Sequence, residues 1–173
     1  QAKDWYVYTD IIDGSMDFLY LNRTDAKGDS SRAVSTDNVN YIGGASTNNI
    51  IGDEYVVYSF HSVSGYSKIG SYEGNAGSNT IYTTDDGTST GSGGFEPSFV
   101  IMKNVEDTTH SHWLILDNKR SPVNPREDEL EANLSIAEQD LNRSVNFVSN
   151  GFELTSNTYT NRSGIDYIYM AFK

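Results

Sequence analysis

An internal repeat constrains the fold of this chain more than any other feature of its sequence. When the sequence is shifted by 111 positions, residues 17–34 align without a gap on residues 128–145. Seven of these positions are identical: Asp17 and Asp128, Leu19 and Leu130, Asn22 and Asn133, Ala26 and Ala137, Asp29 and Asp140, Arg32 and Arg143, Val34 and Val145. Two stretches this similar should share one backbone conformation.

The similarity extends to both ends of the repeated unit. Trp5-Tyr6-Val7 matches Trp113-Leu114-Ile115 at a slightly shorter offset. With one further residue inserted, the C-terminal positions also align: Asn49, Gly52, Tyr55 and Phe60 fall on Asn161, Gly164, Tyr167 and Phe172. We therefore divide the chain into residues 1–61, a partial first repeat that holds the C-terminal part of the unit, and residues 62–173, a complete second repeat.

Only the second repeat has a long stretch, residues 62–112, before its tryptophan. If the strands expected there, within Tyr66–Tyr72, Asn79–Thr84 and Pro97–Lys103, belong to the fold, the first repeat lacks part of its sheet. Exposed sheet edges and a half-built core are unfavourable. We expect a preceding segment or a strand donated by a neighbouring chain to complete it; truncation of a longer protein is the alternative.

Short stretches of β-branched and aromatic residues between turn formers predict an all-β fold. They are Trp5–Tyr8, Phe18–Leu21, Glu54–Phe60, Ser98–Lys103, His112–Leu116, Phe152–Thr155 and Asp166–Phe172. Within Glu54–Phe60, both faces of Tyr55–Phe60 are apolar, which predicts a central strand of a sandwich. Asn150-Gly151 predicts a tight hairpin after Val145–Val148. We expect an antiparallel β-sandwich of the jelly-roll or lectin-like type.

One stretch has a conflicting pattern. Arg126–Asp140 is rich in helix formers, and three of its apolar residues fall on one helical stripe. The repeat favours a different structure, because the matching stretch Asp17–Asp29 has a strand pattern. We therefore predict a short strand at Leu130–Ala132 and a loop over the rest. Thr83–Gly94 is predicted to be a long hairpin loop, and His61–Gly65 the joint between the repeats.

Charge and composition exclude several classes of function. The 173 residues carry a net charge of −12 without a basic stripe, so nucleic acid is not an expected partner. The absence of cysteine excludes disulfides and cysteine metal sites. No apolar run approaches the ~18 residues of a membrane span. The first residues lack a signal peptide and an initiator methionine, so we expect a processed product or part of a longer protein.

The sequence holds no convincing catalytic constellation. His110 and His112 are spaced for one face of a strand but lack a third ligand, so surface histidines are expected. Asp85-Asp86-Gly87-Thr88 resembles a fragment of a calcium loop and is expected to be an acidic turn. Four acids, Glu127, Asp128, Glu129 and Glu131, are expected on a solvated rim rather than as the carboxylate pair of a glycosidase. We expect no enzyme, no cofactor and no bound metal.

Five residues are candidates for ligand contact. Asp117 and Arg120 flank the turn before a proline-rich loop, either as an ion pair that braces the turn or as ligand contacts. Tyr72, Tyr82 and Tyr159 would stack on sugar rings if they are exposed, because a tyrosine offers a flat apolar face and a polar tip.

Several motifs, taken in order, resemble a known family. They are Tyr66-Ser67-Lys68-Ile69-Gly70-Ser71-Tyr72, Gly94-Phe95-Glu96-Pro97-Ser98-Phe99-Val100-Ile101-Met102-Lys103, Trp113-x-Ile115-x-Asp117-x-x-Arg120, Asn150-Gly151-Phe152-x-Leu154 and Asn161-x-x-Gly164-x-x-Tyr167-Ile168-Tyr169-Met170-Ala171-Phe172. This order is similar to the repeated all-β domain of tail-fibre and virion structural proteins of tailed phages, of the marine and cyanophage type. The resemblance covers residues 62–173 and, more weakly, 1–61, where Asp10 has no matching arginine and Tyr41-Ile42-Gly43-Gly44 replaces the Asn-Gly-Phe motif.

The resemblance implies a non-enzymatic structural protein located in the virion, as a tail fibre, an appendage or a host-surface glycan adhesin. It implies a homo-oligomer with other virion proteins or copies of itself as partners, and a cell-surface glycan as a further candidate, without membrane insertion. A capsid-decorating protein and a bacterial extracellular glycan-binding β-sandwich are the alternatives. A glycan hydrolase comes third.

Overall fold

The structure, a computed structural model, describes residues 3–36, 39–41, 49–155 and 159–173. Within these ranges the chain forms strands and no helix, and so no helix that could cross a membrane. The strands are β1 (Tyr6–Thr9), β2 (Asp17–Tyr20), β3 (Gly28–Asp29), β4 (Ser67–Glu73), β5 (Asn79–Tyr82), β6 (Phe99–Asn104), β7 (Leu114–Asp117), β8 (Arg126–Glu131), β9 (Gln139–Val148), β10 (Gly151–Leu154) and β11 (Asp166–Phe172).

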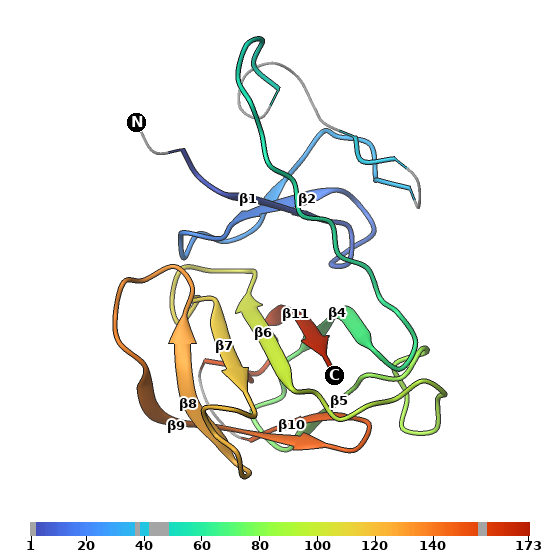
Figure 1. Ribbon diagram of the computed structural model, residues 1–173, viewed down its shortest axis with the longest axis vertical. Coiled ribbons are helices and arrows are strands. Elements are labelled where there is room, and N and C mark those ends of the chain that lie inside the picture. Colours follow the sequence, from blue (N-terminus) through green and yellow to red (C-terminus); the bar gives the residue numbers. More distant parts are fainter. Residues whose placement is uncertain (1–2, 37–38, 42–48, 156–158) are drawn as a thin grey trace.

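Residues 62–173 form one curled antiparallel sheet with the strand order β4-β11-β6-β7-β8-β9-β10-β5. This barrel-like sandwich, called the barrel below, is nearly closed, and β4 and β5 are its edge strands (Figure 1). The tight hairpin joins β9 to β10, with Val148 opposite Gly151. The all-β antiparallel fold predicted from the sequence is thereby confirmed.

The interior of the barrel is filled by alternate side chains of its strands. Its buried members include Val100, Met102, Leu114, Leu116, Val145, Phe147, Phe152, Leu154, Tyr167 and Ala171. Phe95 joins them from the loop before β6, where the Thr83 hydroxyl both donates to and accepts from the Phe95 backbone. Burial of this apolar surface is the main source of the barrel's stability.

Strands β1, β2 and β3 form a separate small sheet that lies against the outer face of the barrel (Figure 1). Leu19 of the small sheet packs with Ile101, Trp113 and Ile168 of the barrel in a second buried cluster. The Trp113 Nε1–H donates to the Tyr20 carbonyl at 2.8 Å. The two repeats are thus joined by a tryptophan buried between them.

The strand registers confirm the internal repeat. Val7 faces Leu19 in the small sheet, and the matching Ile115 faces Leu130 in the barrel. The Asn22 side-chain oxygen accepts from the Trp5 amide at 3.1 Å, and Asn133 accepts from the Trp113 amide at 3.0 Å. The two stretches therefore share one backbone, and the helical pattern of 126–140 was correctly overridden.

Two loop predictions in this region were wrong in their details. The strand is Arg126–Glu131, earlier than the expected Leu130–Ala132, and β9 begins at Gln139 within the expected loop. The inward side chains of β8 are charged, so the strand lacks the usual apolar alternation. Thr83–Gly94 is a loop but closes no hairpin, since β5 pairs with β10 while β6 pairs with β7 and β11.

The prediction of a central strand at Glu54–Phe60 was also wrong. These residues lie outside every strand, with Val56 and Tyr58 each 70% exposed. Their counterpart in the second repeat is β11, which hydrogen-bonds to β4 on one side and to β6 on the other. Among the residues that the structure describes in the first repeat, no strand corresponds to β4 or β6.

Candidate functional site

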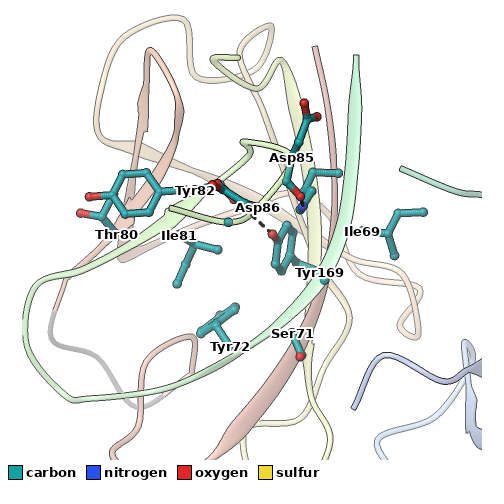
Figure 2. Close-up of a pocket in the computed structure, with 12 residues that line it drawn as sticks. Ile69, Ser71, Tyr72, Thr80, Ile81, Tyr82, Asp85, Asp86 and Tyr169 are labelled. Carbon is teal, nitrogen blue, oxygen red and sulfur yellow. Dashed lines mark hydrogen bonds between the residues drawn. The ribbon is translucent and has the colours of Figure 1, made fainter. Parts of the chain in front are cut away.

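The best candidate site is a pocket of about 350 Å³ at the opening of the barrel, between the edge strands β4 and β5 (Figure 2). Its size is at the lower end of the range of small-molecule sites. It is lined by Lys68, Ile69, Gly70, Ser71, Tyr72, Thr80, Ile81, Tyr82, Asp85, Asp86, Gly87 and Tyr169.

The wall of the pocket is aromatic. Figure 2 shows the Tyr169 ring between the two edge strands, with its hydroxyl directed at the Tyr82 carbonyl, 3.5 Å away. Gly70 permits this arrangement, because a Cβ on Gly70 would lie 2.9 Å from the Tyr169 hydroxyl oxygen. A larger residue at position 70 would displace the ring, so Gly70 sets the shape of the pocket.

The rim of the pocket is polar. Lys68 donates from Nζ to the Asp85 carbonyl at 2.8 Å. The Asp86 carboxylate accepts from the amide and the hydroxyl of Thr88, and these bonds lower the pKa of Asp86. The segment predicted as an acidic turn is therefore a turn closed by an aspartate side chain. Among the described residues, no group of three or more potential ligands could hold a metal ion.

The structure brings two of the predicted tyrosines to this pocket, in different environments. Tyr82 is half-buried on the wall. Tyr72 is only 9% exposed, stacks on Tyr167 with ring centroids 5.0 Å apart, and donates to the Thr160 carbonyl at 2.7 Å. Tyr72 therefore lacks the exposure that stacking on a sugar requires, because β4 turns this side chain into the barrel core.

Tyr159 does not line the pocket. Its half-buried ring lies 4.1 Å from the His110 ring and 3.4 Å from the Arg143 guanidinium carbon. His112 is turned instead toward Glu131, at 3.3 Å from Nδ1 to the carboxylate. The two histidines thus contact different partners, rather than one shared site.

Asp117 and Arg120 form the predicted ion pair, with Arg120 Nε 2.6 Å from the Asp117 carboxylate. The other carboxylate oxygen accepts from the Lys119 and Arg120 amides at 2.8 and 2.9 Å. Burial acts to raise the pKa of Asp117, but these hydrogen bonds outweigh it and lower the pKa. The pair braces the turn after β7, and neither residue lines the pocket.

A buried charge cluster inside the barrel was missed by the sequence analysis. Arg143 Nη1 lies 2.6 Å from Glu129 and 3.2 Å from Glu131. These glutamates are 1% and 7% exposed, so the expectation of a solvated rim was wrong for them. The repeat could have revealed this burial. Phe18 and Tyr20, which align with Glu129 and Glu131, are aromatic, and this indicates that these positions of β8 face inward.

A family model described as Domain of unknown function (DUF7483) matches residues 1–173. The chain belongs to this family. Since the match runs through both repeats, the DUF7483 domain includes the small sheet as well as the barrel. No curated protein and no solved structure matches the chain.

The charge cluster of this DUF7483 domain places two carboxylates, those of Glu129 and Glu131, beside the Arg143 guanidinium group. A pair of carboxylates is also what glycoside hydrolases use for catalysis. Burial raises the pKa of Glu129 to about 7, while Arg143 opposes the shift. Glu129 therefore exchanges a proton near neutral pH. Both glutamates lie inside the barrel and outside the pocket lining. We therefore expect the protonation of Glu129 to affect the stability of the fold.

We expect Glu129→Gln to flatten the pH dependence of stability. Because the pKa of Glu129 is about 7 in the folded protein and near 4.5 when unfolded, the folded state holds an extra proton between these values. Its contribution is complete below pH about 4.5 and is lost as the pH rises through about 7. Urea unfolding of the parent protein should therefore show a loss of about 1–3 kcal/mol in the free energy of unfolding between pH 5 and 8.

Glu127→Gln is the control, because Glu127 is a half-buried neighbour, and this variant should keep the pH dependence of the parent protein. An unchanged pH dependence in Glu129→Gln would contradict a raised pKa for Glu129.

Proposed function

We propose that this DUF7483 domain is a non-enzymatic structural and adhesion module of a phage particle, and that it binds a cell-surface glycan in the β4–β5 pocket. The observation that carries the proposal is the pocket itself, in which tyrosine rings and hydrogen-bonding groups converge at the opening of a rigid barrel.

The chemistry of the lining suits a sugar. Tyr82 and Tyr169 offer ring surface against the apolar face of a pyranose. Asp86 and Asp85 carry carboxylate oxygens that accept hydrogen bonds from hydroxyl groups, and Lys68 carries an ammonium donor. The net charge of −12 disfavours polyanionic ligands, so a neutral or amino sugar is the preferred class.

A non-enzymatic role is supported by the way the strongest candidate acids are used. Glu129 and Glu131 are held by Arg143 inside the barrel, where a substrate would have to displace packed side chains. Asp117 is held by Arg120 in a turn. These pairings favour a role in stability for the charged groups over a role in bond cleavage.

The proposed location in a virion rests on the resemblance of the ordered motifs to those of phage tail-fibre proteins. Association with other particle proteins, or with copies of the chain, is supported by the exposed apolar side chains of residues 54–60. Capsid decoration fits the same surface. A bacterial extracellular glycan-binding domain is the second candidate, because the β4–β5 pocket would serve it equally well.

A glycan array with immobilised sugars tests the binding function. We expect binding by the parent protein, and a loss of at least about tenfold in affinity for Tyr82→Ala and for Asp86→Ala, because a stacked ring or a charged hydrogen bond contributes about 1–3 kcal/mol. Tyr58→Ala is the matched control, since Tyr58 is an exposed tyrosine outside the pocket. Absence of binding to any glycan would contradict adhesion, and release of reducing sugar from a bound glycan would contradict the non-enzymatic assignment.

A further inference from the structure

The charged groups of the β4–β5 pocket leave it with an excess of negative charge. Two carboxylates, those of Asp85 and Asp86, line the pocket together with one ammonium, that of Lys68. Among the residues that the structure describes, the ion pairs include neither of these carboxylates. A cationic group of a ligand would therefore be the first close partner for this negative charge.

The ammonium of Lys68 is held by the backbone rather than by the two carboxylates. Its Nζ donates to the Asp85 carbonyl at 2.8 Å, which ties β4 to the turn after β5. The bond to a neutral peptide oxygen fixes the position of this cation without using the negative charge of the rim. That charge remains for a ligand.

The two carboxylates have different surroundings. The Asp85 Oδ2 accepts from the hydroxyls of Ser64 and Ser92, each at 3.0 Å, and a Cβ on Gly93 would lie 2.5 Å from the Asp85 Oδ1. The Asp85 carboxylate therefore packs into the loop that follows the pocket. Asp86 is exposed, and its Oδ1 accepts from the Thr88 amide and hydroxyl at 3.0 and 2.9 Å. These bonds orient the Asp86 carboxylate on a short turn, so it is the better placed of the two to contact a ligand.

The size and wall of the pocket suit a single sugar ring. The volume of about 350 Å³ is small for a ligand site, and the nearly buried Tyr72 and Ile81 form part of the lining. Tyr82 and Tyr169 add aromatic surface to the wall (Figure 2). One ring that is apolar on one face and carries a cation at its edge would contact both the tyrosines and Asp86.

We infer that the pocket takes one hexosamine residue with a free amino group, whose ammonium donates to the Asp86 carboxylate while its ring contacts Tyr82 and Tyr169. The inference rests on the proposed glycan binding and narrows its ligand from neutral or amino sugars to the cationic class. An N-acetylated or neutral sugar has no charge to place against Asp86. A lysine side chain of a peptide has the ammonium but not the ring, so the two sources can be separated.

The test uses three methyl glycosides that differ only at carbon 2, with an amino, an acetamido or a hydroxyl group, in the gluco and galacto series. Dissociation constants are measured by nuclear magnetic resonance titration at pH 6 and low salt, where a sugar amine is protonated. Asp86 is ionised there, because the Thr88 bonds lower its pKa. In at least one series we expect the amino glycoside to bind on the order of tenfold more tightly than the other two. Lysine amide, an ammonium without a sugar ring, should bind at least about tenfold more weakly than the amino glycoside.

Asp86→Ser removes the charge but keeps an oxygen that can accept from the Thr88 amide. In this variant the three glycosides should bind within about twofold of one another. Asp13→Ser is the matched control, because Asp13 also accepts from the amide and hydroxyl of a residue two positions on, Ser15, and lies outside the pocket. It removes the same charge from the same kind of turn, so the preference for the amino glycoside should remain.

Equal affinity of the parent protein for the three glycosides would overturn the inference, as would a preference that survives Asp86→Ser or is lost in Asp13→Ser. The proposed glycan binding would still stand in these cases if Tyr82→Ala weakened all three ligands. Lysine amide bound as tightly as the amino glycoside would assign the pocket to a peptide and overturn the inference. Failure to bind any glycoside here and any glycan on the array would overturn both proposals.

Discussion

Replacing Trp113 by alanine is expected to lower the free energy of unfolding by about 3–5 kcal/mol and to release the small sheet from the barrel. Trp113 is buried in the cluster between the repeats, and its indole N–H bonds to the Tyr20 carbonyl at 2.8 Å. The substitution leaves a cavity and an unpaired carbonyl between two packed layers. Urea unfolding followed by circular dichroism measures the loss, and faster hydrogen exchange in β1 and β2 reports release of the sheet.

Trp5→Ala is the matched control for this prediction. Trp5 occupies the equivalent position of the first repeat but is largely exposed, so the expected loss is under about 1 kcal/mol. Because the chain has only these two tryptophans, each variant keeps a single tryptophan, whose emission can be excited selectively. The emission should be that of a buried indole in Trp5→Ala and of an exposed one in Trp113→Ala. Equal losses in the two variants would contradict the packing described for the repeats.

Replacing Arg143 by methionine is expected to cost about 3–5 kcal/mol at pH 8. The change leaves Glu129 and Glu131 buried without their cation, and it removes the guanidinium from the Tyr159 ring. At pH 5 the loss should be smaller, because the raised pKa of Glu129 lets this carboxyl take up a proton. Chemical unfolding at both pH values measures the difference.

Arg120→Met is the matched control, because Arg120 pairs with a partly exposed carboxylate in a surface turn. Its expected cost is at most about 1 kcal/mol. A triple variant, Arg143→Met with Glu129→Leu and Glu131→Leu, should recover most of the loss, since apolar residues remove the uncompensated charges. A loss in Arg143→Met that is independent of pH, or no larger than that of Arg120→Met, would count against an internal ion cluster.

The fold class and most strands were predictable, because strand formation is signalled locally. Asp166–Phe172 alternates between core and outer-face residues, and β11 has these bounds. The repeat added non-local information: Leu130 had to adopt the backbone of Leu19, which excluded a helix. The repeat did not give the correct bounds of β8. The glutamates Glu129 and Glu131 point inward, but charged residues are typical of a surface, so the strand pattern was hidden.

Pairing partners were not predictable, since a strand needs a neighbour as well as a sequence. Glu54–Phe60 has the pattern of β11 but lies outside every strand, and the described part of the first repeat holds no counterpart of β6. The candidate site residues likewise include some whose contacts were predictable and some whose contacts were not. Asp117 and Arg120 meet because three residues separate them in a turn, which is a local property. Tyr72 and Tyr82 differ in burial because of how the barrel closes, which sequence spacing does not encode.

The central claim is that the two repeats share one scaffold, and cross-strand nuclear Overhauser effects test it most directly. The account predicts contacts between Tyr6 and Tyr20, and between Tyr8 and Phe18, that are matched by contacts between Leu114 and Glu131, and between Leu116 and Glu129. A shift of one residue in either set would turn the small sheet over relative to the barrel strands. That result would contradict the common scaffold.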